Sequence, residues 1–300
     1  MPVLHEGPEA SHLAAISFHH TGHSVFLSVK DLVKKVHSLV REDSIWSLIQ
    51  GYDLALTDFA KIFLAELALS PTQQHALEYR TRDQSSNPLW HAFRWGRLTA
   101  SRFGAIIRRV KPAGPLVKSL LYDSVPETLP SLKWGREHED DARKCYEAQQ
   151  GCKVACRGLV VDKCGYLGCS PDGVVFHHDE EGLLEIKCPY SARNMDLEEA
   201  CLVVENFCCF LDADGRPCLS KNHDYYYQIQ GSMAILRVKY CDFVVWTLKD
   251  MSIERITFDE QLWNAVMLPR LEKFYFSYLL PEILLPNYPG SEIVERSLYL

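Results

Sequence analysis

The stretch GCSPDGVVFHHDEEGLLEIKCP, from Gly168 to Pro189, holds three ionisable side chains among closely spaced apolar residues. Asp172 lies in the turn-like segment SPDG, and Glu185 and Lys187 lie in a run of Leu and Ile. A buried charged side chain costs free energy unless it has a partner. The question is whether these three charges form a salt bridge, hold a metal ion or remain exposed.

Strand alternation decides which of these side chains share a face. Successive residues of a β-strand point to opposite faces of the sheet. In LLEIKCP, Glu185 and Lys187 therefore share one face, whereas Leu184, Ile186 and Cys188 point to the other face, into the core. The SPDG turn places its aspartate at the start of the preceding strand, which a hairpin joins to this one. Two carboxylates and one ammonium group can therefore meet.

Such a group is compatible with a metal site. Two adjacent carboxylates repel each other, and a divalent cation stabilises both charges. Mg²⁺ takes oxygen ligands, and the backbone carbonyl of Ile186 is a further candidate ligand. A metal there polarises a phosphoryl group, and Lys187 positions or deprotonates a water. The alternative is a salt bridge of Lys187 with Asp172 or Glu185 on a sheet surface, and the spacing alone favours neither.

The surrounding sequence predicts the layers around this hairpin. Helical patterns lie at 131–151, 224–237 and 259–280, the last with a kink at Pro269. Short runs rich in Val, Leu and Ile, bounded by Gly, Asp or Pro, predict strands at 153–162, 166–177, 182–189, 240–248 and 252–258. This order predicts an α/β (α+β) fold with a central mixed β-sheet flanked by helices. Residues 1–80 show helical patterning without a chemical motif, so we expect a helical N-terminal extension over 1–80 and the main domain over 81–300.

Charge and cysteine content limit the class of protein. The 300-residue chain has a net charge of −7, yet residues 84–122 contain no acid and seven Lys or Arg. That basic stretch is either a solvated helix surface or a phosphate-contacting surface. The sequence shows no secretory signal and no apolar run long enough to span a membrane, so we expect a soluble intracellular protein with eleven reduced cysteines. Cys208, Cys209 and Cys218 suit zinc poorly by spacing and are expected to be scattered thiols.

Four blocks of the sequence carry a family resemblance. SPDG followed by LLEIKCP resembles the core of the PD-(D/E)xK nuclease superfamily and, more narrowly, the YqaJ-type viral recombinase and lambda-exonuclease-like family. RWGRLTAS, WGREHEDDA and YYYQIQGSM resemble further segments of that family, in the same order, between Leu89 and Phe276. The resemblance implies a restriction-endonuclease-like core and a Mg²⁺-dependent DNA nuclease, with Mn²⁺ as a substitute metal. It favours a 5′-to-3′ exonuclease that acts on duplex ends.

The resemblance also assigns roles to residues. It implies catalytic roles for Asp172, Glu185, Lys187, Glu139 and Gln230. The implied metal ligands are Asp172, Glu185, Ile186, Glu139 and Asp162. The implied DNA and 5′-phosphate contacts are Arg94, Ser101, Arg97, Arg102 and Gln228.

Several of these roles have plain structural rivals. Glu139 competes with neighbouring surface acids, Asp162 with a role as a turn residue, and Arg94 with stacking on a tryptophan. Because Gln228 and Gln230 are two apart on a helix, they do not share a face, and we expect Gln230 to face the site.

Other functions remain open at this point. The same core also occurs in endonucleases and in nucleases that act on RNA or single strands. A non-catalytic nucleic-acid-binding module is the rival from another class, although the D…E-x-K set is complete here. Ring-shaped trimers occur in the family, so a homo-oligomer is an open alternative, and the sequence names no recombination partner protein.

Overall fold

The computed structural model describes residues 27–39, 53–123, 128–177 and 180–286. Its α-helices are α1 (Val29–Leu39), α3 (Asp53–Leu67), α4 (Pro71–Arg80), α5 (Pro88–Arg94), α6 (Phe103–Ile107), α7 (Gly114–Leu121), α8 (Pro130–Gln150), α9 (Leu197–Val203), α10 (Asp224–Leu236), α11 (Glu260–Leu262), α12 (Leu268–Phe274) and α13 (Leu280–Leu284). Its strands are β1 (Leu98–Thr99), β2 (Val160–Val161), β3 (Leu167–Cys169), β4 (Gly173–His177), β5 (Glu180–Lys187), β6 (Cys209–Leu211), β7 (Pro217–Leu219), β8 (Tyr240–Trp246) and β9 (Met251–Thr257).

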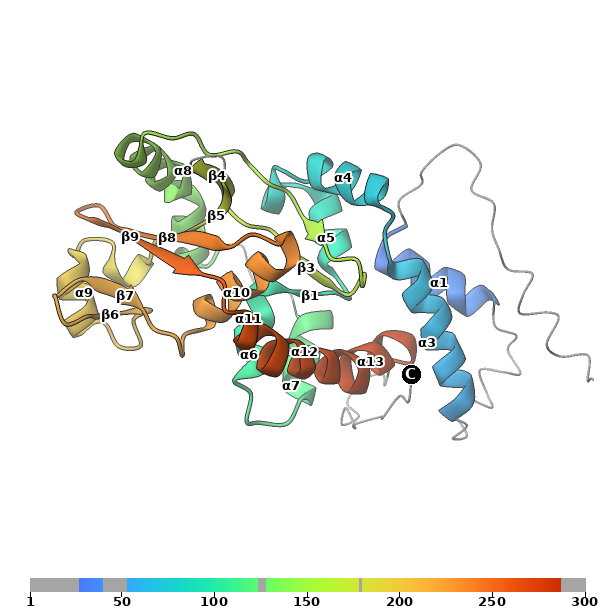
Figure 1. Cartoon of the computed structure of the whole chain (residues 1–300). Helices are drawn as coiled ribbons and strands as arrows, with labels where there is room; N and C mark the ends of the chain where they lie inside the picture. The colour runs from blue at the N-terminus through green and yellow to red at the C-terminus, as the bar shows by residue number, and fades with distance from the viewer. Residues whose placement is uncertain (1–26, 40–52, 124–127, 178–179, 287–300) are drawn as a thin grey trace, which may run out of the picture.

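The main sheet has the order β4-β5-β8-β9 and is mixed, as predicted. β4 pairs with β5 and β8 with β9 in antiparallel fashion, whereas β5 and β8 are parallel. α8 and α10 pack on this sheet from opposite sides (Figure 1). A strand covered on both faces has few solvent-facing positions, and β5 is buried from Gly182 to Ile186.

The alternation expected within β5 is confirmed. Leu184 and Ile186 share an apolar cluster with Tyr146 of α8. Leu183, on the other face, packs in the cluster that contains Ile229 of α10. The face that carries Glu185 is therefore the face covered by α10.

The predicted strand at 166–177 is divided between two sheets. β3 joins the small sheet β1-β3-β2, and β4 begins the main sheet. The break falls at Ser170–Asp172, because the proline cannot donate a ladder hydrogen bond. The carbonyl of Pro171 instead accepts from Gln84 Nε2 at 2.9 Å, and the same amide group donates to the carbonyl of Arg157. Asp172 is therefore held at the junction of the two sheets.

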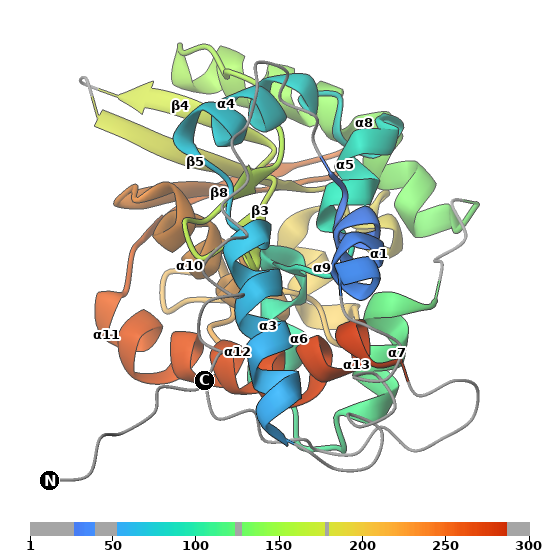
Figure 2. The ribbon, with the colours of Figure 1, turned by 90° about the vertical axis from the view of Figure 1, so that its right-hand side faces the viewer.

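The N-terminal helices share a core with the C-terminal helices. Val29 of α1 and Phe63 of α3 belong to the apolar cluster that contains Leu271 of α12 and Ile283 of α13 (Figure 2). Gly96 lies against α1 with a φ of +75°, and a Cβ there would come within 2.7 Å of Val29. The described part of the expected N-terminal extension is thus built onto the rest of the fold.

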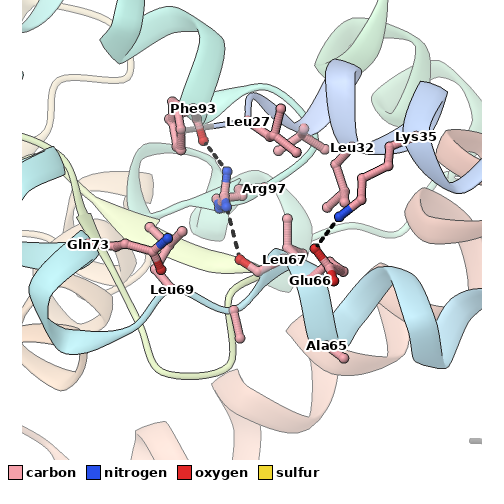
Figure 3. A pocket seen from close by; sticks show the side chains of 12 residues that line it. Leu27, Leu32, Lys35, Ala65, Glu66, Leu67, Leu69, Gln73, Phe93 and Arg97 are labelled. Carbon is pink, nitrogen blue, oxygen red and sulfur yellow. Dashed lines mark hydrogen bonds and ion pairs between the residues drawn. The ribbon is translucent and has the colours of Figure 1, made fainter. Parts of the chain in front are cut away.

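A cavity of about 230 Å³ lies between α1, the end of α3 and α5 (Figure 3). Lys35 and Glu66 form an ion pair of 3.0 Å at its edge, and the side chain of Arg97 closes it from the α5 side. This cavity lies apart from the carboxylates of β5.

The last helical segment departs from regular α-helix where a kink was expected. Residues Trp263–Met267 form a π-helical turn directly before α12, and Pro269 sits in the first turn of α12. Because the helical residues run without a break from 260 to 274, the missing N–H of Pro269 removes one backbone hydrogen bond within the helix. Within the described residues, no helix has the length and apolar character to cross a bilayer.

Candidate active site

The site lies at the carboxyl end of β5, where side chains from four elements meet. β5 supplies Glu185 and Lys187, the β3–β4 junction supplies Asp172, and α8 and α10 supply Glu139 and Gln228. A cleft of about 390 Å³ opens here, lined among others by Glu139, Asp172, Ile186 and Lys187. The structure therefore brings the predicted D…E-x-K residues and the helix-borne glutamate to one place.

Short polar contacts hold the reacting face of the cleft. The carboxylate of Asp172 accepts a hydrogen bond from the Ile186 amide at 2.7 Å. Lys187 Nζ lies 2.5 Å from Glu185 Oε1, and Gln228 Nε2 donates to the same oxygen at 2.5 Å. Lys187 Nζ also lies 4.7 Å from the centre of the Tyr225 ring. Each of these contacts restricts the rotamers of the groups it joins.

The carboxylates of this cluster resist ionisation. Burial, and then the charge of Asp172, raises the pKa of Glu185 to about 7. Burial and the charge of Asp172 likewise raise the pKa of Glu139 to about 8. Burial also raises the pKa of Asp172, although Lys187 and the Ile186 amide oppose it. Burial acts to lower the pKa of Lys187, but the charges of Glu185 and Asp172 outweigh it and raise this pKa. The lysine therefore stays protonated at neutral pH.

The donor set fits a hard divalent cation. Asp172, Glu185 and Glu139 offer carboxylate oxygens, and burial is the main reason why their pKa values are raised, so a bound cation would stabilise their charged forms. Within the described ranges, no three His, Cys, Asp or Glu side chains are already gathered as a complete ligand set. Oε1 of Glu185 accepts hydrogen bonds from Lys187 and Gln228. A bound cation would compete for that oxygen.

A second polar cluster surrounds Arg94. Its guanidinium lies 3.9 Å from the centre of the Trp90 ring, and Nη2 donates to Thr99 Oγ1 and Ser101 Oγ, both at 3.3 Å. Both the stacking role and the approach to Ser101 are thus present. Burial and then the charge of Arg102 lower the pKa of Arg94 to about 10. The cations of Arg94 and Arg102 and the hydroxyl of Ser101 therefore lie close together, and Ser101 is exposed.

Trp90 links this polar cluster to the carboxylate cluster. Trp90 Nε1 donates to Ser170 Oγ at 2.9 Å, and Ser170 stands two residues before Asp172 in the β3–β4 junction. The segment that positions the aspartate thus also positions the tryptophan on which Arg94 stacks.

Three of the predicted site residues, Arg97, Gln230 and Asp162, have structural roles instead. Arg97 is 5% exposed and donates to the carbonyls of Gly165, Phe93 and Leu67, so its guanidinium is used up inside the fold. The structure contradicts the prediction that Arg97 contacts DNA, because its guanidinium is nearly buried and is held by three backbone carbonyls.

The expectation for the two glutamines is reversed. Gln230 is fully buried, donating to the carbonyl of Thr257 and accepting from the amide of Asp259. Gln228, two residues earlier, is the one that contacts Glu185. The packing of α10 on the main sheet turns Gln230 away from the cleft, which the sequence pattern could not reveal.

Asp162 lies outside the carboxylate cluster. Its Oδ1 accepts from the amide of Cys164 at 2.9 Å, which makes it a turn-stabilising residue after β2. Its charge does not contribute to the raised pKa of Asp172. The thiols of the insertion are also dispersed: Cys208 and Cys209 touch each other at 3.8 Å, whereas Cys218 contacts Asp212.

Tyr225 is a site residue that the sequence analysis did not single out. It stands three residues before Gln228, and residues at that spacing share a helix face. It lines the cleft and its ring lies beside Lys187. That spacing within YYYQIQ is the signal that would have found it.

The comparison with known families agrees with this geometry. The sequence profile described as the YqaJ-like viral recombinase domain matches residues 89–239, half of the chain. The chain belongs to this family. The matched residues contain every YqaJ-like block used above and end just after α10.

Named relatives of this YqaJ-like chain are nucleases. An alkaline nuclease of Orgyia pseudotsugata multicapsid polyhedrosis virus is 29% identical over 188 residues, which cover 56% of this chain. The match covers 42% of the viral protein, so the chain spans less than half the length of that relative. An alkaline exonuclease from Laribacter hongkongensis superposes with a TM-score of 0.51 at 26% identity, over 66% of this chain and 94% of the exonuclease. The structure of that exonuclease with dAMP gives a TM-score of 0.51 at 24% identity and shows the same fold.

Proposed function

We propose that the chain is a Mg²⁺-dependent DNA nuclease that acts as a 5′-to-3′ exonuclease on duplex ends. The observation that carries this proposal is the cluster of Asp172, Glu185 and Glu139 beside a protonated Lys187 in an open cleft. Membership of the YqaJ-like family and the names of the relatives support the same reaction class. DNA as the substrate, the 5′-to-3′ polarity and Mg²⁺ as the metal are all parts of this proposal.

The residues of the cluster divide the work between them. Asp172, Glu185, Glu139 and the Ile186 carbonyl would hold the divalent cation, with Mn²⁺ as a substitute. When bound, the cation polarises the scissile phosphoryl group and lowers the pKa of a water. The chain itself supplies the positioning: the Ile186 amide orients Asp172, and Gln228 orients Glu185.

Lys187 acts as a cation in this scheme. Its raised pKa keeps it protonated at neutral pH, so it donates hydrogen bonds instead of accepting a proton. Held between Glu185 and the Tyr225 ring, it orients the attacking water and stabilises the charge that develops on the phosphate. Of the two roles that the sequence allows for Lys187, positioning a water or deprotonating it, the raised pKa favours positioning.

Arg94, Arg102 and Ser101 would hold a terminal 5′-phosphate. Guanidinium and hydroxyl groups suit phosphate oxygens, and in the described residues neither arginine pairs with a carboxylate. The β3–β4 junction links this phosphate site to Asp172. A phosphate held there would therefore fix how far the nucleic-acid strand extends toward Asp172. Cleavage would then be directional and would start from phosphorylated ends.

The test compares three substrates at one Mg²⁺ concentration. Linear duplex with 5′-phosphate ends, the same duplex with 5′-hydroxyl ends, and covalently closed circles are incubated with the full chain. We expect rapid release of mononucleotides from the phosphorylated duplex, slower release from the hydroxyl duplex and no cutting of circles. Cutting of circles would replace the exonuclease by an endonuclease, and the absence of cleavage with every divalent metal would refute the nuclease itself.

A further inference from the structure

A basic groove lies outside the active-site cleft, where α6 packs against α12 (Figure 1). Its volume is about 360 Å³. Four cations and two aromatic rings line it: Arg108, Arg109, Arg270, Lys273, Phe274 and Tyr278. Two of these cations come from the acid-free stretch of the sequence, and two come from the C-terminal helix, more than 150 residues later.

Three of the four cations of this groove are not neutralised by any described residue, whereas Arg108 pairs with Asp224. In the described part of the chain, no Asp or Glu lines the groove, and Arg109, Arg270 and Lys273 have no carboxylate within ion-pair distance. Many other basic residues are paired, such as Lys144 with Asp140 and Arg255 with Asp242. An uncompensated group of cations in a chain of net charge −7 indicates that an external anion provides the compensation.

The cations are also held in place before any ligand arrives. The guanidinium of Arg109 lies 5.8 Å from the centre of the Phe274 ring and 5.4 Å from that of Tyr278, and it donates to the carbonyl of Lys111. Arg270 Nη1 donates to the carbonyl of Ile107 at 2.7 Å. The buried Nε of Arg109 has no partner among the described residues. Preorganised cations lose little conformational entropy when they bind an anion.

The groove is linked to the active-site cleft through the start of α10. Arg108, at the end of α6, forms an ion pair of 2.7 Å with Asp224. Asp224 stands between His223 and Tyr225, which both line the cleft. The contact is close, because a Cβ on Gly104 would lie 2.5 Å from the Asp224 Cα. The groove therefore begins where the wall of the cleft ends.

We propose that the groove between α6 and α12 binds the phosphate backbone of the nucleic acid whose end occupies the cleft. This inference rests on the proposed function and names a second contact for the same substrate. A nucleic acid whose end occupies the cleft extends beyond it with regularly spaced phosphate charges. The cations of the groove, which begins beside the cleft wall, would contact those phosphates. The described lining contains no Asn, Gln, Asp or Glu, and backbone carbonyls already hold Arg109 and Arg270, so we expect contacts to phosphates and not to base edges.

The proposal is tested with the full chain and the double variant Arg270→Gln/Lys273→Gln. Both side chains are exposed, so the fold should tolerate the change, and thermal unfolding verifies that it does. The control is Lys118→Gln, an exposed cation of the same acid-free stretch that does not line the groove. Binding is measured by fluorescence anisotropy in Ca²⁺ with a duplex of about 20 base pairs, roughly 70 Å long at about 3.4 Å per base pair. Cleavage in Mg²⁺ is measured on that duplex and on a 5′-phosphorylated trinucleotide.

We expect the double variant to bind the duplex more weakly, with a slope of log affinity against log salt that is smaller by about 1.8, or about 0.9 per lost phosphate contact. The KM for the duplex should rise, kcat should stay, and cleavage of the trinucleotide should equal that of the wild type. Lys118→Gln should behave like the wild type.

Three outcomes would overturn the proposal. If the wild type cleaves the duplex but the double variant keeps its salt slope and KM, the groove does not contact the substrate. If poly-glutamate binds the wild type and is lost in the double variant while duplex binding is unchanged, the groove serves an acidic protein instead. A wild type that neither binds nor cleaves either substrate would remove the proposed function, and this inference with it.

Discussion

Replacing Glu139 by glutamine should stabilise the metal-free protein at high pH and reduce its nuclease activity. Glu139 has no hydrogen bond or ion pair among the described residues, and its carboxylate faces the charges of Asp172 and Glu185. Glutamine has nearly the same shape and no charge. The substitution therefore removes repulsion without creating a cavity and without breaking a contact.

The magnitude follows from the raised pKa. The pKa of Glu139 rises from 4.5 to about 8, mainly through burial. Below pH 4.5 the carboxyl is protonated in both the folded and the unfolded chain, so it does not affect stability. Between pH 4.5 and about 8 only the unfolded chain releases the proton, so the wild type loses stability as the pH rises. At about 1.36 kcal/mol per pH unit the loss is on the order of 5 kcal/mol, and partial exposure reduces it to about 3.

The assay is urea unfolding with EDTA at pH 5 and pH 9. We expect Glu139→Gln to match the wild type at pH 5 and to exceed its unfolding free energy by about 3 kcal/mol at pH 9. Glu137→Gln is the matched control, because Glu137 lies on the same helix, is exposed and forms only a 3.7 Å ion pair with Lys133. Its effect should stay within about 0.5 kcal/mol at both values. Saturating Mg²⁺ should stabilise the wild type more than Glu139→Gln, because the variant has lost one carboxylate ligand.

An equal unfolding free energy of Glu139→Gln and wild type at pH 9 would refute this reasoning. It would mean that the folded protein stabilises the Glu139 carboxylate despite its burial and the nearby charge of Asp172. A gain that is the same at pH 5 and pH 9 would also contradict it, since a charge effect must grow between those values.

Three further substitutions separate the site from its scaffold. Lys187→Ala should lower the cleavage rate by about 10² to 10³ while duplex binding in Ca²⁺ is largely kept; an active Lys187→Ala would remove this lysine from the mechanism. Gln228→Ala should lower kcat without loss of stability, whereas Gln230→Ala should cost about 2 kcal/mol of unfolding free energy, because two buried backbone groups lose their partners; urea unfolding and kinetics on both variants check this, and the reverse assignment would restore the sequence-based expectation. Arg94→Ala should abolish the preference for 5′-phosphorylated ends, whereas Arg97→Ala should lower stability by about 3 kcal/mol and leave that preference unchanged in the folded fraction, as measured on matched phosphate and hydroxyl ends.

The local geometry of the site could be predicted from the sequence, because it depends on short-range rules. Strand alternation alone placed Glu185 and Lys187 together and Leu184 in the core, and the contact of 2.5 Å between the two charged groups agrees. The hairpin of β4 and β5 agrees with the prediction from the SPDG segment and the strand-like run LLEIKCP that follows it. The family blocks then indicated that the helix-borne Glu139 joins them.

What failed depends on long-range packing. The spacing of Gln228 and Gln230 shows only that they point in different directions, and the rotation of α10 on the sheet decides which one reaches Glu185. Arg97 is one of seven cations in the acid-free stretch 84–122, and nothing local shows that three carbonyls from separate segments surround it. The groove of α6 and α12 was invisible for the same reason, since its cations come from distant parts of the chain.

The position of Asp172 between two sheets has a consequence for how activity appears during folding. β3 is held by pairing with β1 and β2, and β4 is held by pairing with β5. Between them, a hydrogen bond from Gln84 holds Pro171. Neither sheet alone can position the Asp172 carboxylate, so a chain in which only one sheet has formed should not cleave nucleic acid. In a refolding experiment, cleavage should be the last signal to recover, later than helix content and later than burial of the tryptophans. The enzyme would therefore be harmless to nucleic acid for as long as it is incompletely folded.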